Sequence, residues 1–463
     1  MLFTSAIFIF AFAPIAIVVF WLLPQRWRLH WLTIASYYFY AWWDWRFCLI
    51  MLFTTIVDYN AGRQMAVAKS RAQARWWLIA SLVANLGMLG FFKYAGFAAR
   101  TVDAIAALFG GNAHVPILDI VLPVGISFYT FQSMTHTIDI YWRRAKPAAY
   151  FMHFAAYVSM FPQLVAGPIV RWKHIDQQLL NFPAHLTWDR LSLGLTFFAA
   201  GLIKKMLIAD RLAYFVDPLW TDYTHLAPGE AWLAMLGYGL QIYFDFAGYS
   251  LMAIGLGHLL GVSIPQNFNS PYRASDITDF WRRWHMTLSS WLRDYLFVAL
   301  GGLHVTKRWV ALLGTMLLAG LWHGAAWTFV LWGGFHGAAL TIHHALRALK
   351  LKWRGRYWGT AGTLLLVMLG WVLFRAPSLH VAGHIYATLF DVRRLAEPCH
   401  VPLDFPAMIV VALAWAIFAP NTYQLIHARQ ARPRIAVQIT LGILAALSVL
   451  FLSGSSPFLY YQF

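Results

Sequence analysis

Acidic residues are scarce in this chain, and glutamate is nearly absent. Only 11% of its 463 residues are charged, and its glutamates are Glu230 and Glu397. Soluble domains carry about 25% charged residues, so the composition excludes an ordinary soluble globular protein. A reaction that pairs two glutamates as acid and base is not expected.

Cysteine and the common catalytic motifs are also missing. Cys48 and Cys399 lie far apart and fit no metal or redox spacing, so we expect two unpaired thiols and no metal site. The sequence has no H-E-x-x-H zinc motif, no G-x-S-x-G nucleophile elbow and no G-x-x-x-x-G-K phosphate loop. These absences argue against metalloproteases, serine hydrolases and ATPases. The function classes that remain are a histidine-based transferase and a transporter.

Apolar residues dominate what is present. They make up 60% of the chain, and the mean hydropathy is +0.58. Many runs reach the ~20 apolar residues that cross a bilayer, which indicates a polytopic membrane protein. Residues 2–23 are interpreted as a retained first span, because Arg26 and Arg28 follow where a leader would carry a cleavage site.

The net charge of +17 comes from basic residues in short loops between apolar segments. This pattern places those loops in the cytoplasm and argues against nucleic-acid binding. Three such loops carry Arg63, Lys69, Arg71 and Arg75; Lys350, Lys352, Arg354 and Arg356; and Arg429, Arg432 and Arg434.

Periodicity predicts one all-α membrane domain over 1–463, with about 11–13 helical segments. The polar stretch 170–190 is predicted to be a cytoplasmic or interfacial loop, and 110–118 and 376–406 are expected on the other side. The expected helices are Ala6–Leu23, Trp31–Trp43, Phe47–Tyr59, Leu78–Phe92, Ile120–Tyr141, Tyr150–Ala166, Leu191–Ile208, Leu233–Leu260, Trp309–Leu331, Thr360–Phe374, Ala407–Phe418 and Val437–Leu450.

The stretch DFWRRWHMTLSSWLRDY, residues 279–295, is the most informative. Wound as one helix, it gathers aromatic and leucine side chains on one face. The other face holds Asp279, Arg282, His285, Ser289 and Arg293. An interfacial helix with snorkelling arginines and the wall of a reaction chamber explain this pattern equally well.

Ionisable side chains also occur inside apolar runs, notably Asp245 in YFDF and His323 in LAGLWHGAAW. Each is costly in a bilayer and faces either a partner or a water-filled path. For any one of them, including His136, His336, His343 and His344, a polar tie between helices is the simpler interpretation. Several converging in one bundle would instead indicate a site, where a neutral histidine could take a proton from an attacking hydroxyl.

The ordered motifs resemble those of the membrane-bound O-acyltransferases, specifically the bacterial branch that holds the alginate O-acetyltransferase membrane subunit and the teichoic-acid D-alanyl transferase. The resemblance covers nearly the whole chain. It rests on SYYFYAWWDWRF, LPVGISFYTFQSMTHTIDIY, FPQLVAGPIVR, QIYFDFAGYSLMAIGLG, NFNSPYRASDITDFWRRWHMTLSSWLRDY, LLAGLWHGAAWTFVLWGGFHG, WVLFRA and SPFLYYQF.

The resemblance implies roles for particular residues. His323 stands at the family's essential histidine and is the expected catalytic base. His285 matches the second signature histidine, expected to orient substrate or polarise the carbonyl. The implied architecture is a ring of helices around a central tunnel, lined here by Arg282, Ser289, Arg293, Asp245, Trp322 and Gly324. Gly320 and Gly324 are expected to leave room beside His323 for a thioester or an acyl chain.

The implied activity is transfer of an acyl group, with acetyl favoured, from a cytoplasmic thioester such as acetyl-CoA or an acyl carrier protein. No bound cofactor is implied. A periplasmic serine-type acetyltransferase would receive the group and modify a cell-surface polysaccharide such as alginate. The expected location is the bacterial cytoplasmic (inner) membrane. Two alternatives stay open: a proton-coupled transporter or flippase for an envelope precursor, and a scaffold that only recruits a periplasmic enzyme.

Overall fold

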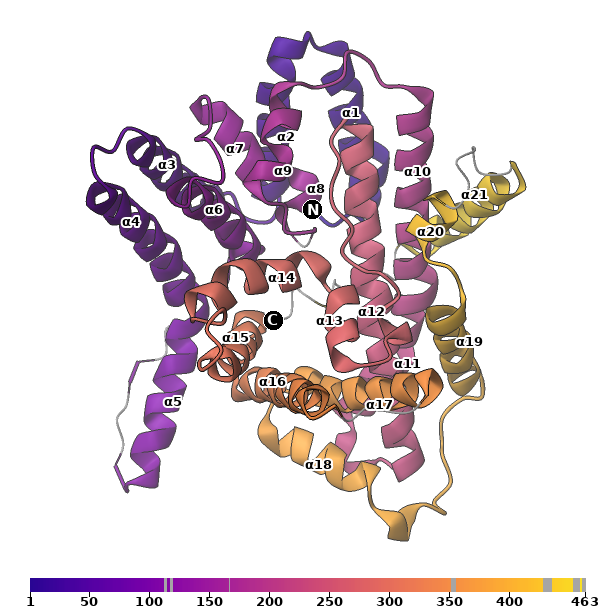
Figure 1. Ribbon diagram of the computed structural model, residues 1–463. Coiled ribbons are helices and arrows are strands. Elements are labelled where there is room, and N and C mark those ends of the chain that lie inside the picture. The colour runs from indigo at the N-terminus through magenta and orange to yellow at the C-terminus, as the bar shows by residue number, and fades with distance from the viewer. Residues whose placement is uncertain are drawn as a thin grey trace. The chain divides into compact units, whose positions relative to one another are not determined.

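A computed structural model describes residues 1–111, 115–116, 120–165, 167–350, 355–427, 435–452 and 459. Every regular element in these ranges is a helix, in agreement with the all-α prediction (Figure 1). Lys352, Arg354 and the basic loop Arg429, Arg432 and Arg434 lie outside the described residues, as does the terminal SPFLYYQF except Leu459.

Three helical stretches among the described residues are long and apolar enough to cross a membrane: Arg71–Leu108, Trp188–Thr221 and Arg356–Arg375. The first of them is apolar and largely uncovered, with Trp76 71% and Val83 66% exposed. A soluble surface rarely carries large apolar side chains in such a continuous array. Lipid is the environment that suits this surface, and the chain is a membrane protein.

Contacts group the described residues into two compact units. The first comprises Met1–Phe198 and Met252–Pro265, and the second comprises Ala199–Leu251 and Gln266–Phe463. The chain passes from one unit to the other within helices α10 (Trp188–Ile203) and α12 (Pro228–Leu259).

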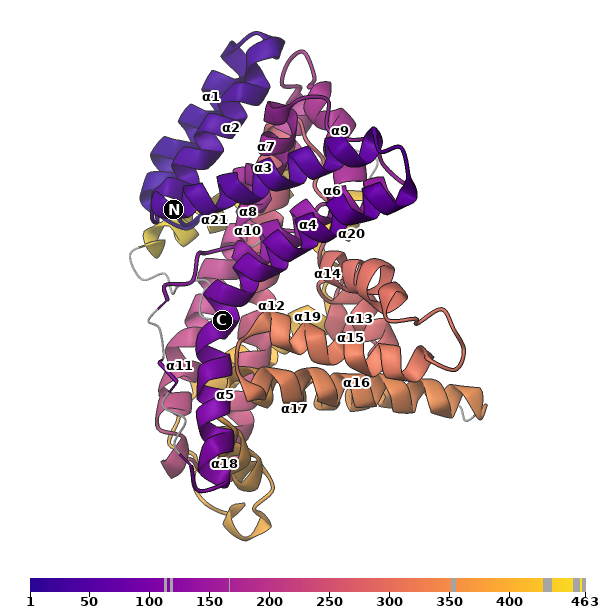
Figure 2. The same ribbon diagram turned by 90° about the vertical axis from the view of Figure 1, so that its left-hand side faces the viewer.

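In the first unit, α3 (Arg46–Ala66), α4 (Arg71–Leu89) and α6 (Ile126–Tyr141) pack side by side (Figure 2). The buried carboxylate of Asp58 on α3 accepts hydrogen bonds from Ser81 and Asn85 on α4 and from Ser133 on α6. The remaining helices of this unit include α1 (Ala13–Leu22), α2 (Gln25–Ala41), α5 (Ala95–Leu108), α7 (Phe151–Ser159), α8 (Phe161–Leu164) and α9 (Trp172–Leu180).

The second unit holds α11 (Asp210–Thr221) and the later helices. Among these, α15 (Arg308–His323), α16 (Trp327–Ala348) and α17 (Arg356–Arg375) pack in succession (Figure 1). The others are α13 (Ile277–Arg283), α14 (Met286–Trp291), α18 (Leu379–Leu389), α19 (Asp404–Phe418), α20 (Thr422–His427) and α21 (Ile435–Leu450).

The described chain forms more and shorter helices than the 11–13 predicted segments. Expected loops at 170–190 and 376–406 contain α9 and α18, and α5 and α11 were not anticipated. The expected helix Tyr150–Ala166 ends at Ser159, and a new turn of helix starts with Pro162 in its first turn. Proline is accommodated in a first turn and breaks a helix interior, which explains this division.

Candidate active site

The stretch predicted as one helix from Asp279 to Tyr295 is broken at Trp284 and His285. Helix α13 ends at Arg283, and Trp284 takes an extended conformation with φ −94° and ψ 129°. His285 adopts the left-handed conformation, with φ 42° and ψ 54°, and α14 starts at Met286. Non-glycine residues seldom adopt this conformation, although histidine does so more readily than most, and such residues concentrate at functional sites.

The side chain of Asn267 helps to hold His285 in this conformation. Its Oδ1 lies 3.1 Å from Nδ1 of His285 and accepts from the Thr287 hydroxyl at 2.9 Å and the Thr287 N–H at 3.3 Å. Its Nδ2 donates to the hydroxyl of Ser250 on α12 at 3.2 Å. The buried amide of Asn267 therefore links its own segment to the turn around His285 and to α12.

His285 is completely buried among aromatic rings. The ring of Phe246 meets it edge-on at 4.7 Å between centroids, and Trp322 lies 6.3 Å away. Burial lowers the pKa of His285 to about 3. The imidazole is therefore neutral near pH 7 and can act as a hydrogen-bond donor on one nitrogen and an acceptor on the other.

His323 is the last residue of α15, at the tip of the hairpin that α15 forms with α16. Gly324 follows in an extended conformation, so the predicted continuous helix Trp309–Leu331 is wrong. The buried His323 ring packs against Trp322, Trp332 and Phe374, with centroid distances of 4.9, 5.0 and 5.3 Å. The break places His323 at the end of α15, next to the turn that leads into α16.

Trp322 joins the two predicted site histidines. Its indole lies against His323 on the same helix and against His285 from a separate segment. The structure thus brings His285 and His323 to a common aromatic neighbour. Among the other expected histidines, His136 accepts a hydrogen bond from the N–H of Ala148, as a polar tie would, and His343 lies 3.6 Å from Asp276.

Gly320 and Gly324 do not leave open space beside His323. A Cβ on Gly320 would collide with the backbone carbonyl of Phe329, where α15 and α16 cross closely. A Cβ on Gly324 would collide with the ring of Phe329. Both glycines permit close packing within the hairpin, so the expected room for a thioester at these positions is wrong.

The polar face predicted around His285 does not form either. Arg282 is exposed, and the side chain of Arg293 is 68% exposed and pairs with Asp294 at 2.7 Å. Ser289 donates its hydroxyl hydrogen to the carbonyl of Trp284, across the break. Because the helix is interrupted, the 100° spacing that placed these side chains beside His285 does not apply.

Asp245 lies in a buried cluster of charges. Its Oδ1 is 2.7 Å from the ammonium group of Lys205, which also lies 2.7 Å from Asp210. The N–H of Leu459 donates to Oδ2 of Asp245 at 2.9 Å. The sequence analysis missed Lys205, although a Lys204–Lys205 pair in the apolar run TFFAAGLIKKMLIAD was a usable signal.

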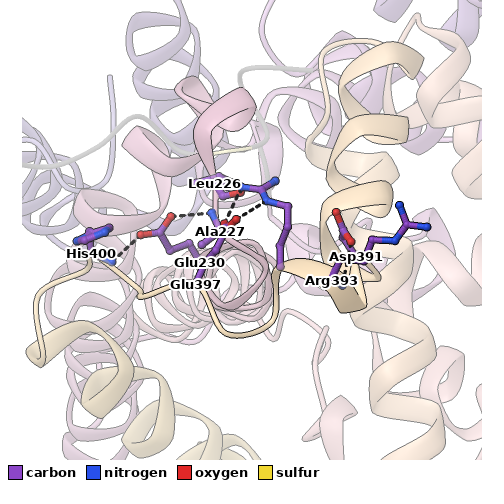
Figure 3. A network of polar contacts seen from close by, with 8 residues as sticks. Leu226, Ala227, Glu230, Asp391, Arg393, Glu397 and His400 are labelled. Carbon is purple, nitrogen blue, oxygen red and sulfur yellow. Dashed lines mark hydrogen bonds and ion pairs between the residues drawn. The ribbon is translucent and has the colours of Figure 1, made fainter.

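Both glutamates have structural partners at the start of α12 (Figure 3). Glu230 accepts from the N–H of Ala227 at 3.0 Å, as in a capping box, and from the N–H of His400 at 2.7 Å. Glu397 pairs with Arg394, which also donates to the carbonyl of Leu226. These contacts anchor the loop after α18.

The described residues contain no group of three or more His, Cys, Asp or Glu placed to hold a metal ion. What the second unit offers instead is a neutral buried histidine, a second histidine at a helix end and a wall of tryptophan and phenylalanine rings. Histidines that aromatic rings shield from water suit acyl transfer, which needs a base that takes the proton of the attacking hydroxyl.

Comparison with known proteins assigns the family. The model of MBOAT, the membrane-bound O-acyltransferase family, matches residues 38–382. The chain belongs to this family. It is therefore an acyltransferase, and both His285 and His323 fall within the matched region.

The similarity to individual relatives covers most or all of the chain. The chain is 39% identical over 505 residues to the probable alginate O-acetylase AlgI of Azotobacter vinelandii, with 100% of both chains covered. It is 44% identical over 402 residues to that of Pseudomonas aeruginosa, covering 84% of this chain and 75% of the relative. It is 36% identical over 437 residues to the peptidoglycan O-acetyltransferase of Helicobacter pylori, covering 87% and 82%.

Proposed function

We propose that the protein transfers an acetyl group from a thioester in the cytoplasm toward a cell-surface polysaccharide, from a position spanning the bacterial inner membrane several times. The observation that carries this proposal is the pair of buried histidines, His285 and His323, packed against Trp322 in a chain of this family. Full-length similarity to alginate O-acetylases supports alginate as the polymer.

His323 is the proposed base. A hydroxyl oxygen attacks the carbonyl carbon of the thioester while His323 takes the hydroxyl proton, and the carbon–sulfur bond then breaks. The thiolate leaves with that proton, so the ring returns to its neutral form and an ester has replaced a thioester. A buried histidine at a helix end is suited to this cycle, because its ring takes up one proton and then releases it.

The donor is proposed to be acetyl-CoA or an acyl carrier protein. The acceptor is proposed to be a periplasmic serine-type acetyltransferase, which would complete the transfer to the polymer. A ring of helices with a central tunnel, built as one membrane domain over 1–463, would connect the two membrane faces. Asp245 and Trp322 have buried positions compatible with such a wall, whereas the exposure of Arg282 and Arg293 gives them no support as lining residues. The proton-coupled transporter is not favoured, because the family is one of acyltransferases.

The test is acetylation of the exported polymer in cells that carry His323→Ala in place of the wild-type chain. We expect acetylation to fall below detection while the membrane content of the protein is unchanged. His344→Ala is the matched control, because this histidine lies near the end of α16 and is proposed to have no part in the reaction. Normal acetylation in the His323→Ala strain would refute the proposed role of this residue.

A further inference from the structure

Three groups lie within hydrogen-bond distance of the side-chain oxygen of Asn267. Two Thr287 donors, the hydroxyl at 2.9 Å and the backbone N–H at 3.3 Å, point at it, and Nδ1 of His285 lies 3.1 Å away. Asn267, Thr287 and His285 are all buried, so water cannot replace these contacts.

The backbone N–H of Thr287 decides which atom of the Asn267 amide points toward His285. An N–H group can only donate, so the atom it meets must be the oxygen. With the amide turned over, its NH₂ group would face that N–H, so two donors would oppose each other and the hydrogen bond would be lost at a cost of about 1–3 kcal/mol. The nitrogen is then free to donate to Ser250, as observed at 3.2 Å.

The orientation of the amide in turn fixes the imidazole. Because Oδ1 of Asn267 can only accept, Nδ1 of His285 must carry the hydrogen. We propose that Asn267 is a positioning residue that keeps neutral His285 protonated on Nδ1, so that Nε2 presents its lone pair. This inference rests on the proposed function and specifies the part of His285 in it.

The assigned tautomer changes the chemistry expected of His285. A neutral ring with a lone pair on Nε2 accepts a hydrogen bond there and cannot donate one to a carbonyl oxygen. His285 therefore orients a donor group, such as the hydroxyl of the acyl acceptor or the N–H of an amide, and does not polarise the thioester. This excludes one of the two roles expected from the family resemblance.

The surrounding backbone keeps this arrangement from rotating. The N–H of Met286 donates to the backbone carbonyl of Asn267 at 2.8 Å, and the N–H of Asn269 donates to that of Arg283 at 2.9 Å. These bonds bind the segment before the 3-10 turn Pro271–Arg273 to both sides of the break at His285. The rings of Phe246 and Trp322 pack on the imidazole, and the Asn267 amide supplies a polar contact at Nδ1.

The test is a double-mutant cycle of Asn267→Leu and His285→Gln in the full-length protein with its cellular partners, measured as the rate of polymer acetylation. We expect Asn267→Leu to lower the rate about 100-fold or more in the wild-type background. In the His285→Gln background it should add less than about threefold, because the ring through which Asn267 acts is gone. Equal losses in both backgrounds would show a purely structural role and overturn the proposal.

Two further measurements keep the proposal testable if Asn267→Leu fails to fold. Asn267→Asp retains an acceptor facing Nδ1, so activity should be kept within about tenfold, with the acid limb of the pH profile moved to higher pH by the new negative charge. Loss of all activity in properly inserted Asn267→Asp protein would contradict the proposal.

The second measurement is independent of turnover. Nitrogen-15 NMR of the wild-type protein, with the His285 signals assigned by comparison with His285→Gln, should show the hydrogen on Nδ1. A hydrogen on Nε2 would overturn the inference. The proposed function fails separately, if His323→Ala and His285→Gln both acetylate polymer at the wild-type rate.

Discussion

The ammonium group of Lys205 lies 2.7 Å from the carboxylate of Asp245, and both side chains are buried. Lys205 belongs to a helical stretch long and apolar enough to cross a membrane. The same ammonium group lies 2.7 Å from Asp210, so one cation serves two carboxylates. The two short ion pairs offset the free-energy cost of burying these charges. We therefore expect removal of Lys205 to destabilise the fold more than removal of either carboxylate.

We predict that Lys205→Met destabilises the protein by about 3–5 kcal/mol, because two buried carboxylates lose their cation. Asp245→Asn should cost less, since Lys205 keeps Asp210 and the new amide can still accept from the N–H of Leu459. Thermal unfolding in detergent compares the two variants. The prediction is wrong if Asp245→Asn is the more destabilising change.

The close crossing of α15 and α16 gives a second prediction. Gly320→Ala places a methyl group against the carbonyl of Phe329, whereas Gly314→Ala on the same helix meets only an ordinary contact with Leu300 at 3.6 Å. Alanine is otherwise favoured over glycine in a helix by about 1 kcal/mol. Gly314→Ala should therefore leave the melting temperature unchanged or raise it, and Gly320→Ala should lower it by several degrees. Equal shifts in the two variants would show that the helices do not cross there.

The sequence was enough to identify the family, because its motifs, including those around His285 and His323, are local. It could not place the break at His285, since that break depends on Asn267, a residue from a separate segment. Helical periodicity treats Asp279 to Tyr295 as one rod and so grouped Arg282 and Arg293 with His285. The partner of Asp245 is similarly distant, and sequence alone marks only that a lysine lies in an apolar run.

Gly324 lies at the start of a chain of ring contacts that ends at His323. A side chain at this position would push on Phe329, whose ring lies 5.0 Å from Phe374, which in turn lies 5.3 Å from His323. We predict that Gly324→Ala lowers the acetylation rate at least about tenfold, because misplacement of a reacting group by about 1 Å can cost up to 100-fold.

The compensating change for Gly324→Ala is Phe329→Leu, which removes the ring that the new methyl group meets. The combined variant should recover part of the lost rate, measured as polymer acetylation per amount of inserted protein. Recovery would show that the loss passes through Phe329. If the combined variant is as slow as Gly324→Ala alone, the ring contacts do not transmit the change to His323.

The last prediction concerns acid stability. Burial lowers the pKa of His285 to about 3 in the folded protein, and the ordinary value near 6.5 applies once the chain unfolds. Between these values the unfolded state binds more protons, so the free energy of unfolding falls as the pH falls. One extra proton bound by the unfolded state changes the free energy of unfolding by about 1.4 kcal/mol per pH unit. His285 therefore lowers the free energy of unfolding by about 2 kcal/mol between pH 6.5 and pH 5. Above pH 6.5 the effect vanishes.

This contribution is isolated by measuring the free energy of unfolding of the wild-type protein and of His285→Gln at pH 7.5 and pH 5. Every other titrating group is common to the two proteins. The variant should be the less stable protein at pH 7.5, since Gln fits the site around Asn267 less well. Its deficit should shrink by about 2 kcal/mol at pH 5, where the wild type alone bears the cost of keeping this imidazole neutral. A deficit that stays constant between the two pH values would mean that the ring of His285 is not shielded from protons in the folded protein.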